Sequence, residues 1–290
     1  MGFFVGLQHV LPQHLLSRVV LGATRVRARW FKDALIGAFL KGYSPEMGDA
    51  REPDPHAYDS FNEFFTRALR EGARPVAPGA EVLVSPVDGT VSQAGPIQGN
   101  QIFQAKGHDY SLEALLAGAA PEWAPRFRDG TFATIYLAPY NYHRIHMPLD
   151  GTLHESWFVP GRLFSVNAAT AAGVPGLFAR NERLVCLFES EAGPYAVILV
   201  GALFVGSMGT IWHGDELPHR GGAAFKLPQH PTGAPLYQEK GAELGRFNMG
   251  STVILLFGKD RLDLLSRCVN GETVRMGEAL GQVHTGPARA

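Results

Sequence analysis

The sequence predicts an α+β fold with a mostly antiparallel, barrel-like or sandwich-like β core, preceded by amphipathic helices. Short apolar runs recur between turn residues through most of the chain, a spacing typical of antiparallel strands. No long helical pattern alternates with these runs, which argues against a doubly wound parallel sheet. The first 41 residues differ from the rest, because they combine apolar side chains with an excess of positive charge.

Composition places the chain among globular proteins. Its 290 residues are 46% hydrophobic and 18% charged, which is enough apolar content to bury a large core. The formal net charge is only -1, which argues against a nucleic-acid partner. The two cysteines, Cys186 and Cys268, form no CxxC pattern and lie in apolar surroundings, so we expect buried thiols in a reducing compartment.

The N-terminal segment is basic and amphipathic. Over residues 1–41 six lysines and arginines stand against a single acid, Asp33, so the local charge is +5. Polar residues such as Gln8, His9 and Arg18 interrupt the apolar ones before any run reaches the roughly 18 residues of a spanning helix. The pattern also does not fit a secretory signal. We expect helices that lie on a membrane surface, with helices packed on the domain or at a subunit contact as the alternative.

The next elements follow from capping and turn residues. A polar connection over residues 43–55 leads to a short helix over residues 60–69, with Ser60 as its N-cap. Asp88-Gly89 between apolar runs predicts a hairpin turn, and a second helix is expected over residues 111–116. Four later runs are predicted strands: residues 132–137, 184–188, 195–205 and 253–257.

Two histidines three residues apart, His143 and His146, follow the first of these strands and a turn. Pro148 ends the segment, so we expect it to be extended, with side chains at i and i+3 on opposite sides. A shared metal site is therefore disfavoured, and HExxH is absent. Each histidine is expected to act alone; a base needs an acid to fix its tautomer, and Asp88 is the candidate. Structural roles for the histidines, and turn formation alone for Asp88, stay open.

Gly250 and Ser251 stand at the head of the last apolar run. A serine hydroxyl is able to attack the carbonyl that precedes it, which turns the peptide bond into an ester and then breaks the chain. A glycine before the serine permits a strained backbone at that carbonyl. Taken alone, the pair is more simply explained as a turn glycine followed by a strand-edge serine.

Five segments stand out together, in the order 86–89 (PVDG), 142–148 (YHRIHMP), 164–167 (FSVN), 177–183 (LFARNER) and 245–252 (GRFNMGST). In this order they resemble phosphatidylserine decarboxylases of the bacterial, membrane-associated type. The resemblance covers nearly the whole chain, including the basic N-terminus. One departure is Met249, where the family commonly has leucine, a volume-conserving change.

The resemblance implies a proenzyme that cleaves itself by internal serinolysis. His146, oriented by Asp88, would take the hydroxyl proton of Ser251. The oxygen of Ser251 would then attack the carbonyl of Gly250. Elimination of the ester would leave dehydroalanine, which hydrolyses to ammonia and a pyruvoyl group.

The implied cleavage would divide the chain into a β chain, residues 1–250, and an α chain, residues 251–290. The expected organisation is a basic, helical, membrane-associating region over residues 1–70 and a β-rich catalytic domain over residues 71–290. The pyruvoyl group at the head of the α chain is the cofactor that the resemblance implies, with no metal.

The implied reaction converts phosphatidylserine to phosphatidylethanolamine and carbon dioxide, a step of phospholipid biosynthesis, through a Schiff base on the pyruvoyl ketone. His143 is the candidate to position the carboxylate or deliver a proton, and Ser165 and Phe164 are candidates for substrate contact. The expected partners are the lipid in the membrane, the chain's own two fragments and a second processed copy in a homodimer. The expected location is peripheral, on the cytoplasmic face of the cell membrane.

Two other functional classes stay open. One is a pyruvoyl-dependent decarboxylase of a soluble amino acid, against which the basic amphipathic N-terminus argues. The other is a non-catalytic, membrane-associated β domain in which every motif is a turn or part of the core. Two fragments in place of one chain would separate a self-cleaving enzyme from this last class.

Overall fold

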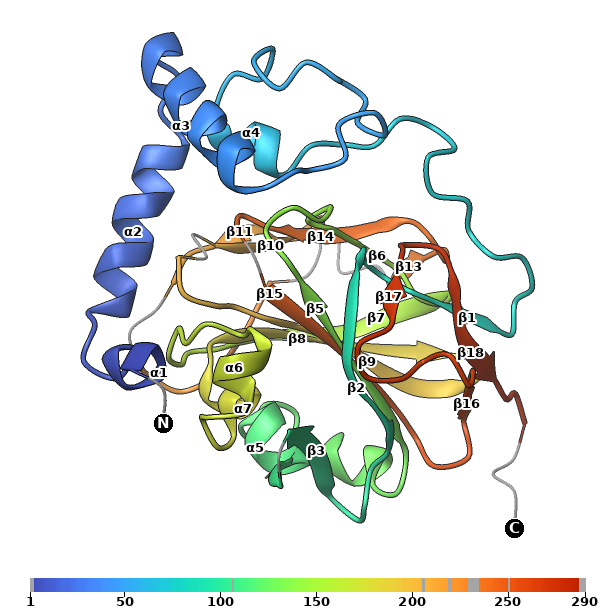
Figure 1. Ribbon diagram of the computed structural model, residues 1–290. Coiled ribbons are helices and arrows are strands. Elements are labelled where there is room, and N and C mark those ends of the chain that lie inside the picture. Colours follow the sequence, from blue (N-terminus) through green and yellow to red (C-terminus); the bar gives the residue numbers. More distant parts are fainter. Residues whose placement is uncertain are drawn as a thin grey trace.

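A large antiparallel sheet forms the body of the protein (Figure 1). The computed structural model describes residues 3–105, 107–204, 207–218, 221–228, 235–249 and 251–286. Within these residues the strand order is β12-β7-β8-β9-β15-β5-β2-β17, with β13 paired to β7, so the sheet is open at both ends. The bounds are β2 Gly89–Pro96, β5 Thr131–Leu137, β7 Gly151–Val159, β8 Arg183–Ser190, β9 Gly193–Val200, β12 Phe225–Lys226, β13 Leu236–Gln238, β15 Ser251–Phe257 and β17 Thr273–Val274. The predicted α+β class with antiparallel pairing is confirmed.

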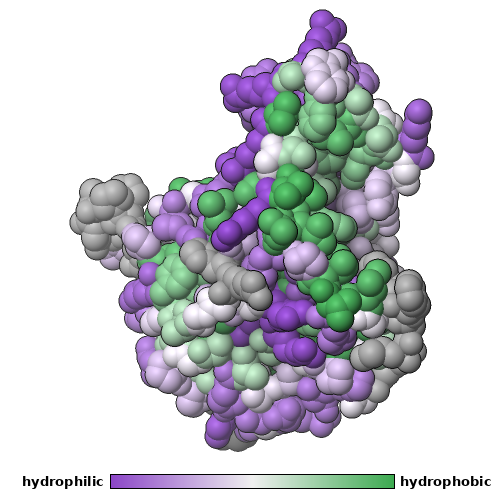
Figure 2. Space-filling model, turned by 90° about the vertical axis from the view of Figure 1, so that its left-hand side faces the viewer, coloured by the Kyte–Doolittle hydropathy of each residue, from purple (hydrophilic) through white to green (hydrophobic). Residues whose placement is uncertain are grey.

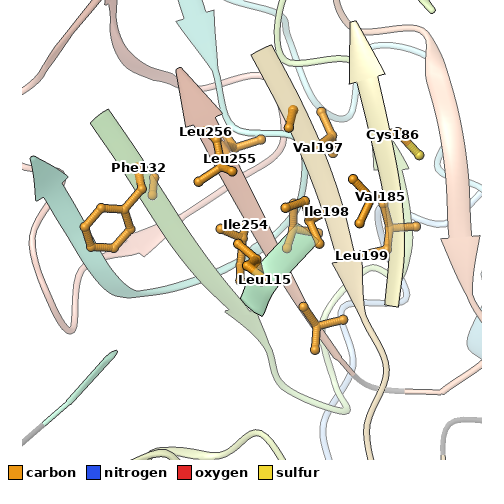
Figure 3. Packing of buried hydrophobic residues seen from close by; sticks show 14 of the residues in the cluster. Leu115, Phe132, Val185, Cys186, Val197, Ile198, Leu199, Ile254, Leu255 and Leu256 are labelled. Atoms are coloured by element: carbon orange, nitrogen blue, oxygen red, sulfur yellow. The ribbon is translucent and has the colours of Figure 1, made fainter. Parts of the chain in front are cut away.

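Strand β15 lies in the middle of this sheet, because it is apolar on both faces. It pairs antiparallel with β5 on one side and β9 on the other, and all seven of its residues are buried. A strand covered on both faces has a continuous apolar run in place of an alternation, as residues 253–257 do. Figure 3 shows side chains of β5, β15, β9 and β8 packed together, with Leu115 of α5 (Leu112–Leu116) in the same core.

Smaller antiparallel sheets accompany the body. Among the described residues their orders are β1-β18-β16, β11-β10-β14-β6 and the pair β3-β4. Their bounds are β1 Val82–Val84, β3 Gln101–Ala105, β4 His108–Ser111, β6 Arg144–His146, β10 Met208–Thr210, β11 Gly214–Glu216, β14 Glu243–Phe247, β16 Leu262–Leu264 and β18 Ala279–Val283.

The hairpin predicted at Asp88-Gly89 is wrong. Strand β1 pairs with β18, whereas β2, which begins at Gly89, pairs with β5 and β17. The Asp88 carboxylate accepts hydrogen bonds from Arg74 and from the backbone amide of Met276. It therefore holds this segment to two distant parts of the chain and does not form a hairpin turn. Gly89 is needed for a different reason, because a Cβ there would lie 2.5 Å from the carbonyl oxygen of Tyr136 on β5.

The two predicted helices are present, the first with its predicted cap Ser60 and the second with Ser111 as its cap. Ser60 and Ser111 each accept a hydrogen bond from the amide three residues later, at the starts of α4 (Phe61–Phe65) and α5. Helix α4 is shorter than predicted, because residues 68–70 pair with residues 49–51 in an extended conformation. A long-range partner therefore overrides the local helical pattern.

Other predicted bounds hold or shift by a few residues. The runs at 132–137, 184–188 and 253–257 lie within β5, β8 and β15. The run over residues 195–205 forms β9 only as far as Val200, after which the amide of Gly201 bonds to the carbonyl of Glu182; Val205 lies outside the described residues. The short helices η1 Ala124–Phe127, α6 Ala168–Ala171 and α7 Leu177–Arg180 were not predicted.

The N-terminal helices form a layer along one side of the body and rise above it (Figure 1). They are α1 Phe3–Leu7, α2 Gln13–Thr24 and α3 Arg29–Gly42. Ile36 of α3 packs in a small cluster apart from the main core, with Phe61, Phe64 and Phe65 of α4. Met249 contacts both this cluster and the main core, so it joins the helical layer to the sheet. Of the described helices, none has both the length and the apolar content that a membrane crossing requires.

Removal of a side chain from the centre of the sheet tests this packing. Leu255→Ala deletes a fully buried side chain of β15 and is expected to lower the free energy of unfolding by about 2–5 kcal/mol, because the cavity cannot close fully. Leu265→Ala, at a residue that is 40% exposed, is the matched control and is expected to cost less than about 1 kcal/mol. Urea unfolding measures both, and equal losses would contradict the assigned core.

Candidate active site

Ser251 lies at the start of the central strand, sealed from solvent. It is the first residue of β15 and is in register with Leu137 at the end of β5. The residue is fully buried, and its Oγ has no hydrogen-bond partner among the described residues. A buried hydroxyl without a partner costs about 1–3 kcal/mol, and it leaves the oxygen free to react. Gly250, on the other side of the predicted cleavage bond, lies outside the described residues.

The chain that leads to Ser251 is both fixed and strained. Asn248 is fully buried; its side-chain nitrogen donates to Ser207 Oγ at 2.5 Å, and its Oδ1 accepts from Asn62 at 3.1 Å. Met249 follows with a φ of +132°, a conformation that costs a residue with a side chain about 1–3 kcal/mol. Backbone strain is therefore present two residues before Ser251.

His143 is a fully buried, neutral imidazole with one free nitrogen. Its ring faces that of Phe65, with the ring centroids 4.1 Å apart. Nδ1 donates to the carbonyl of Asn141 at 2.9 Å, so Nε2 is an acceptor, and it has no partner among the described residues. Burial lowers the pKa of His143 to about 3; the Asn141 bond opposes this shift, and the charge of Arg67 adds to it.

His146, at the end of β6, uses both ring nitrogens. Nδ1 donates to the carbonyl of Gly241 at 2.7 Å, and Nε2 accepts from the hydroxyl of Tyr142 at 2.9 Å. Burial lowers the pKa of His146, while the Gly241 bond and the charge of Glu243 oppose that shift. Nε2 is therefore the unprotonated nitrogen, in the tautomer that a general base requires. It is already occupied by the hydrogen bond from the hydroxyl of Tyr142.

Asp88 is buried just before β2 and is tied to a cation. Arg74 holds both carboxylate oxygens, with Nη2 to Oδ2 at 2.7 Å and Nε to Oδ1 at 3.0 Å. The amide of Met276 donates to Oδ1 at 2.9 Å. Arg74 also bonds to Asp49 at 2.5 Å, so this guanidinium is shared between two carboxylates.

The predicted site residues are not joined to one another by hydrogen bonds among the described residues. No described hydrogen bond joins Asp88 to His146, or Ser251 to His143 or His146. The charge of Asp88 nevertheless raises the pKa of His146, although burial dominates. The predicted extended segment between the histidines is confirmed as β6. Within the described ranges, no three His, Cys, Asp or Glu side chains converge as a metal site would require.

An apolar cavity of about 220 Å³ lies next to the predicted cleavage position. Its wall includes Leu137, the register partner of Ser251, and Met249. Ser165 also lines it, whereas Phe164 is fully buried in the core and is not on this wall. Aromatic side chains from the helical part of the chain line it as well: Phe39, Tyr43 and Phe65. A path of apolar residues therefore connects the N-terminal layer to the neighbourhood of Ser251.

Comparison with known proteins gives the family. The model described as phosphatidylserine decarboxylase matches residues 61–282, and one described as PSD matches residues 3–44. Proteins named phosphatidylserine decarboxylase proenzyme, from Pseudomonas paraeruginosa and Pseudomonas fluorescens, are 52% and 50% identical, each alignment covering 96% of both chains. A protein of that name from Shewanella denitrificans is 50% identical over 97% of both chains. The chain belongs to the phosphatidylserine decarboxylase family.

Some features of the candidate site in this member of the family were not predicted from the sequence. Tyr142 adjoins a predicted histidine, but no local pattern indicates that its hydroxyl covers His146. Arg74 binds Asp88 from 14 positions away, and Asn62 binds Asn248 from 186 positions away. Such pairs have no spacing signature, because tertiary packing decides them. The sequence shows these residues only as polar side chains between apolar ones. Many surface positions have the same pattern, so it does not single out a buried polar contact.

Burial of neutral His143 predicts acid sensitivity of the uncleaved chain. An unfolded histidine titrates near pH 6.5, and the fold lowers the pKa of His143 to about 3, so the unfolded chain binds more protons below pH 6.5. Its contribution to the free energy of unfolding is complete above about pH 6.5 and falls with pH, by up to about 2 kcal/mol at pH 5. His143→Gln is expected to remove this part of the pH dependence.

Urea unfolding of the Ser251→Ala chain from pH 7.5 to pH 5 measures the effect. His108→Gln, at a half-buried histidine of β4, is the matched control. Its free energy of unfolding is expected to change with pH as that of the parent does. The same slope in the parent and in His143→Gln would show that this ring is not the buried neutral group described here.

Proposed function

We propose that the chain is a phosphatidylserine decarboxylase proenzyme that cleaves itself between Gly250 and Ser251 and converts Ser251 into a pyruvoyl group. Membership of the family supports the decarboxylase activity, and the proenzyme name of its relatives supports processing. The observation that carries the residue assignment is the buried, unpartnered Oγ of Ser251, which follows the strained Met249.

Self-cleavage at this position is a balanced rearrangement. The Oγ of Ser251 bonds to the carbonyl carbon of Gly250 while the C–N bond breaks, which gives an ester and a free amine. Elimination then breaks the Cβ–O bond, so that Gly250 leaves as a carboxylate, Cα loses its proton and residue 251 becomes dehydroalanine. After tautomerisation one water replaces the nitrogen, and ammonia leaves. Serine suits this chemistry because its β-carbon carries an oxygen that is able to leave.

A general base must take the proton of Ser251, and we assign this role to His146. Its Nδ1 is fixed as the donor to Gly241, which leaves Nε2 as the basic nitrogen. Because Nε2 accepts from Tyr142, that hydroxyl must turn aside or relay the proton. We assign Asp88 to stabilise the protonated ring, since its charge raises the pKa of His146.

The pyruvoyl ketone, once formed, would supply the electron sink for loss of carbon dioxide. The surroundings of Ser251 fit such a group, because the position is fully buried and adjoins an apolar cavity where a carboxylate is poorly solvated. We assign His143, with its free Nε2, to position the carboxylate or return a proton to the reacting carbon. Ser165 is assigned a substrate contact on the cavity wall, whereas Phe164, the other predicted contact, is fully buried and does not line the cavity.

The N-terminal layer supports attachment to a lipid surface. Figure 2 shows apolar side chains gathered on the side of the molecule where this layer lies. Val10, Leu15, Val19 and Trp30 are exposed there, Trp30 at 78%. Each nearby cation adds about 1 kcal/mol of attraction to anionic lipids. We propose that residues 1–70 dock on the cytoplasmic face of the membrane and pass the lipid to a catalytic domain over residues 71–290. This exposed apolar layer favours a lipid substrate over a soluble amino acid.

Intact mass spectrometry tests cleavage. The wild-type chain is expected to give two fragments, residues 1–250 and 251–290, the second beginning with a pyruvoyl group. Ser251→Ala lacks the attacking oxygen and is expected to stay one chain with no release of carbon dioxide from phosphatidylserine. Thr252→Val, which also removes a buried, unpartnered hydroxyl, is the matched control and is expected to cleave. A fully active wild-type chain in one piece would refute the pyruvoyl assignment.

The two histidines are expected to act at different steps. His146→Ala and Asp88→Asn are expected to slow cleavage by about 100-fold or more, because general-base catalysis is lost. His143→Ala is expected to cleave and then to lose turnover. The time course of fragment formation measures the first effect, and carbon dioxide released per cleaved chain measures the second. If His143→Ala stays uncleaved, the assigned division of roles is wrong.

A further inference from the structure

A second cavity, of about 230 Å³, adjoins the turn over residues 138–142 that connects β5 to β6. The two cavities share this turn, since Pro139 lines the apolar one and Tyr140 lines this one. We call it the arginine cavity. Its wall carries three arginines and two carboxylates: Arg67, Arg74, Arg275, Glu46 and Asp88.

Two of the three arginines are already neutralised. Arg74 is paired with Asp88 at 2.7 Å, and Arg275 is paired with Glu46 at 2.8 Å. These pairs use both carboxylates of the wall. Arg74 is also paired with Asp49 at 2.5 Å, so three carboxylates pair with these two arginines, whereas Arg67 forms no ion pair with any of them among the described residues.

Arg67 is buried, at 3% exposure, and its contacts are all uncharged. Its Nη2 donates to the carbonyl of Tyr140 at 3.3 Å, and its guanidinium lies 5.9 Å from the ring centre of Phe64. Its Nε has no hydrogen-bond partner, and none of the ion pairs between described residues includes this side chain. Burial of an unpaired cation is costly and lowers the pKa of Arg67. A bound anion would offset that cost.

Arg67 is also close to the proposed active site. Tyr140, whose carbonyl it binds, lies three residues beyond Leu137, the register partner of the cleavage serine. Two residues before Arg67, Phe65 faces the ring of His143. The charge of Arg67 also lowers the pKa of His143, so the two groups interact through space. An anion on Arg67 would therefore belong to a molecule that reaches the reacting centre.

We infer that Arg67 binds the phosphodiester of the lipid headgroup in the arginine cavity, an assignment that rests on the proposed function. A guanidinium forms two parallel hydrogen bonds with a phosphate, and the free Nε with a neighbouring Nη supplies that geometry. The substrate carboxylate is the poorer ligand, because a cation that stabilised it would favour the ground state and slow its loss. The phosphate keeps its charge throughout, so its binding anchors the substrate without opposing the reaction.

Binding to the uncleaved Ser251→Ala chain tests the inference apart from activity. Isothermal titration calorimetry with glycerophosphoserine probes the headgroup phosphodiester without acyl chains, and serine and inorganic phosphate are the comparison probes. Glycerophosphoserine is expected to bind at least about tenfold more tightly than serine. Arg67→Met is expected to weaken its binding at least about tenfold, because charge-assisted hydrogen bonds are lost. Arg67→Lys keeps the positive charge but loses the two parallel donors of the guanidinium. Its affinity for glycerophosphoserine is expected to lie between those of the parent and Arg67→Met.

Arg51→Met, which removes the same charge from an exposed side chain, is the matched control and is expected to bind like its parent. If Arg67→Met binds glycerophosphoserine as tightly as its parent does, the inference is overturned. It is also overturned if the parent binds inorganic phosphate but not glycerophosphoserine. Thermal unfolding shows which variants fold; if Arg67→Met does not, parental affinity in Arg67→Lys overturns it. The proposed function fails separately, through an uncleaved or inactive wild-type chain, and that result does not alter these affinities.

Discussion

The pairing of β15 with both β5 and β9 is the constraint on which the rest of the structure depends. Because β15 begins at Ser251, the ladder that builds the core also buries the reactive hydroxyl. Seven register pairs with β5 and six with β9 lie beyond the proposed cleavage bond. Strands β17 and β18 add pairs to β2 and β1. The C-terminal fragment would therefore stay in place after cleavage without a covalent link.

A hydrogen bond and an ion pair also join the residues before the proposed cleavage bond to the residues after it. Asp88 accepts from the amide of Met276, and Arg275 pairs with Glu46, so the proposed α chain is bonded to the proposed β chain near the site. Arg74 forms an ion pair with Asp88, and the charge of Asp88 raises the pKa of His146 by less than burial lowers it. Loss of one partner from a buried ion pair costs about 3–5 kcal/mol. Asp88 therefore has a structural task beside the electrostatic one proposed for it.

The sequence predicts those features that are decided locally. Residues 253–257 are a continuous apolar run and form a strand buried on both faces, and Ser60 and Ser111 cap the helices that follow them. Features decided by distant partners were missed. Asp88-Gly89 has the composition of a hairpin turn, yet β1 finds its partner in β18. The order of motifs predicts candidate site residues, but not the contacts of Tyr142 or Arg74, which depend on packing.

Met249 connects the helical layer to the chemistry proposed at Ser251. Its side chain contacts both the main core and the cluster that contains Ile36 and Phe65, and its own backbone is the strained one. A strained conformation persists only where the surrounding contacts hold it. The contacts that fasten the N-terminal helices to the sheet therefore also hold the chain ahead of Ser251 in a costly geometry. The N-terminal helical layer and the proposed cleavage position are therefore connected through the side chain and backbone of this one residue.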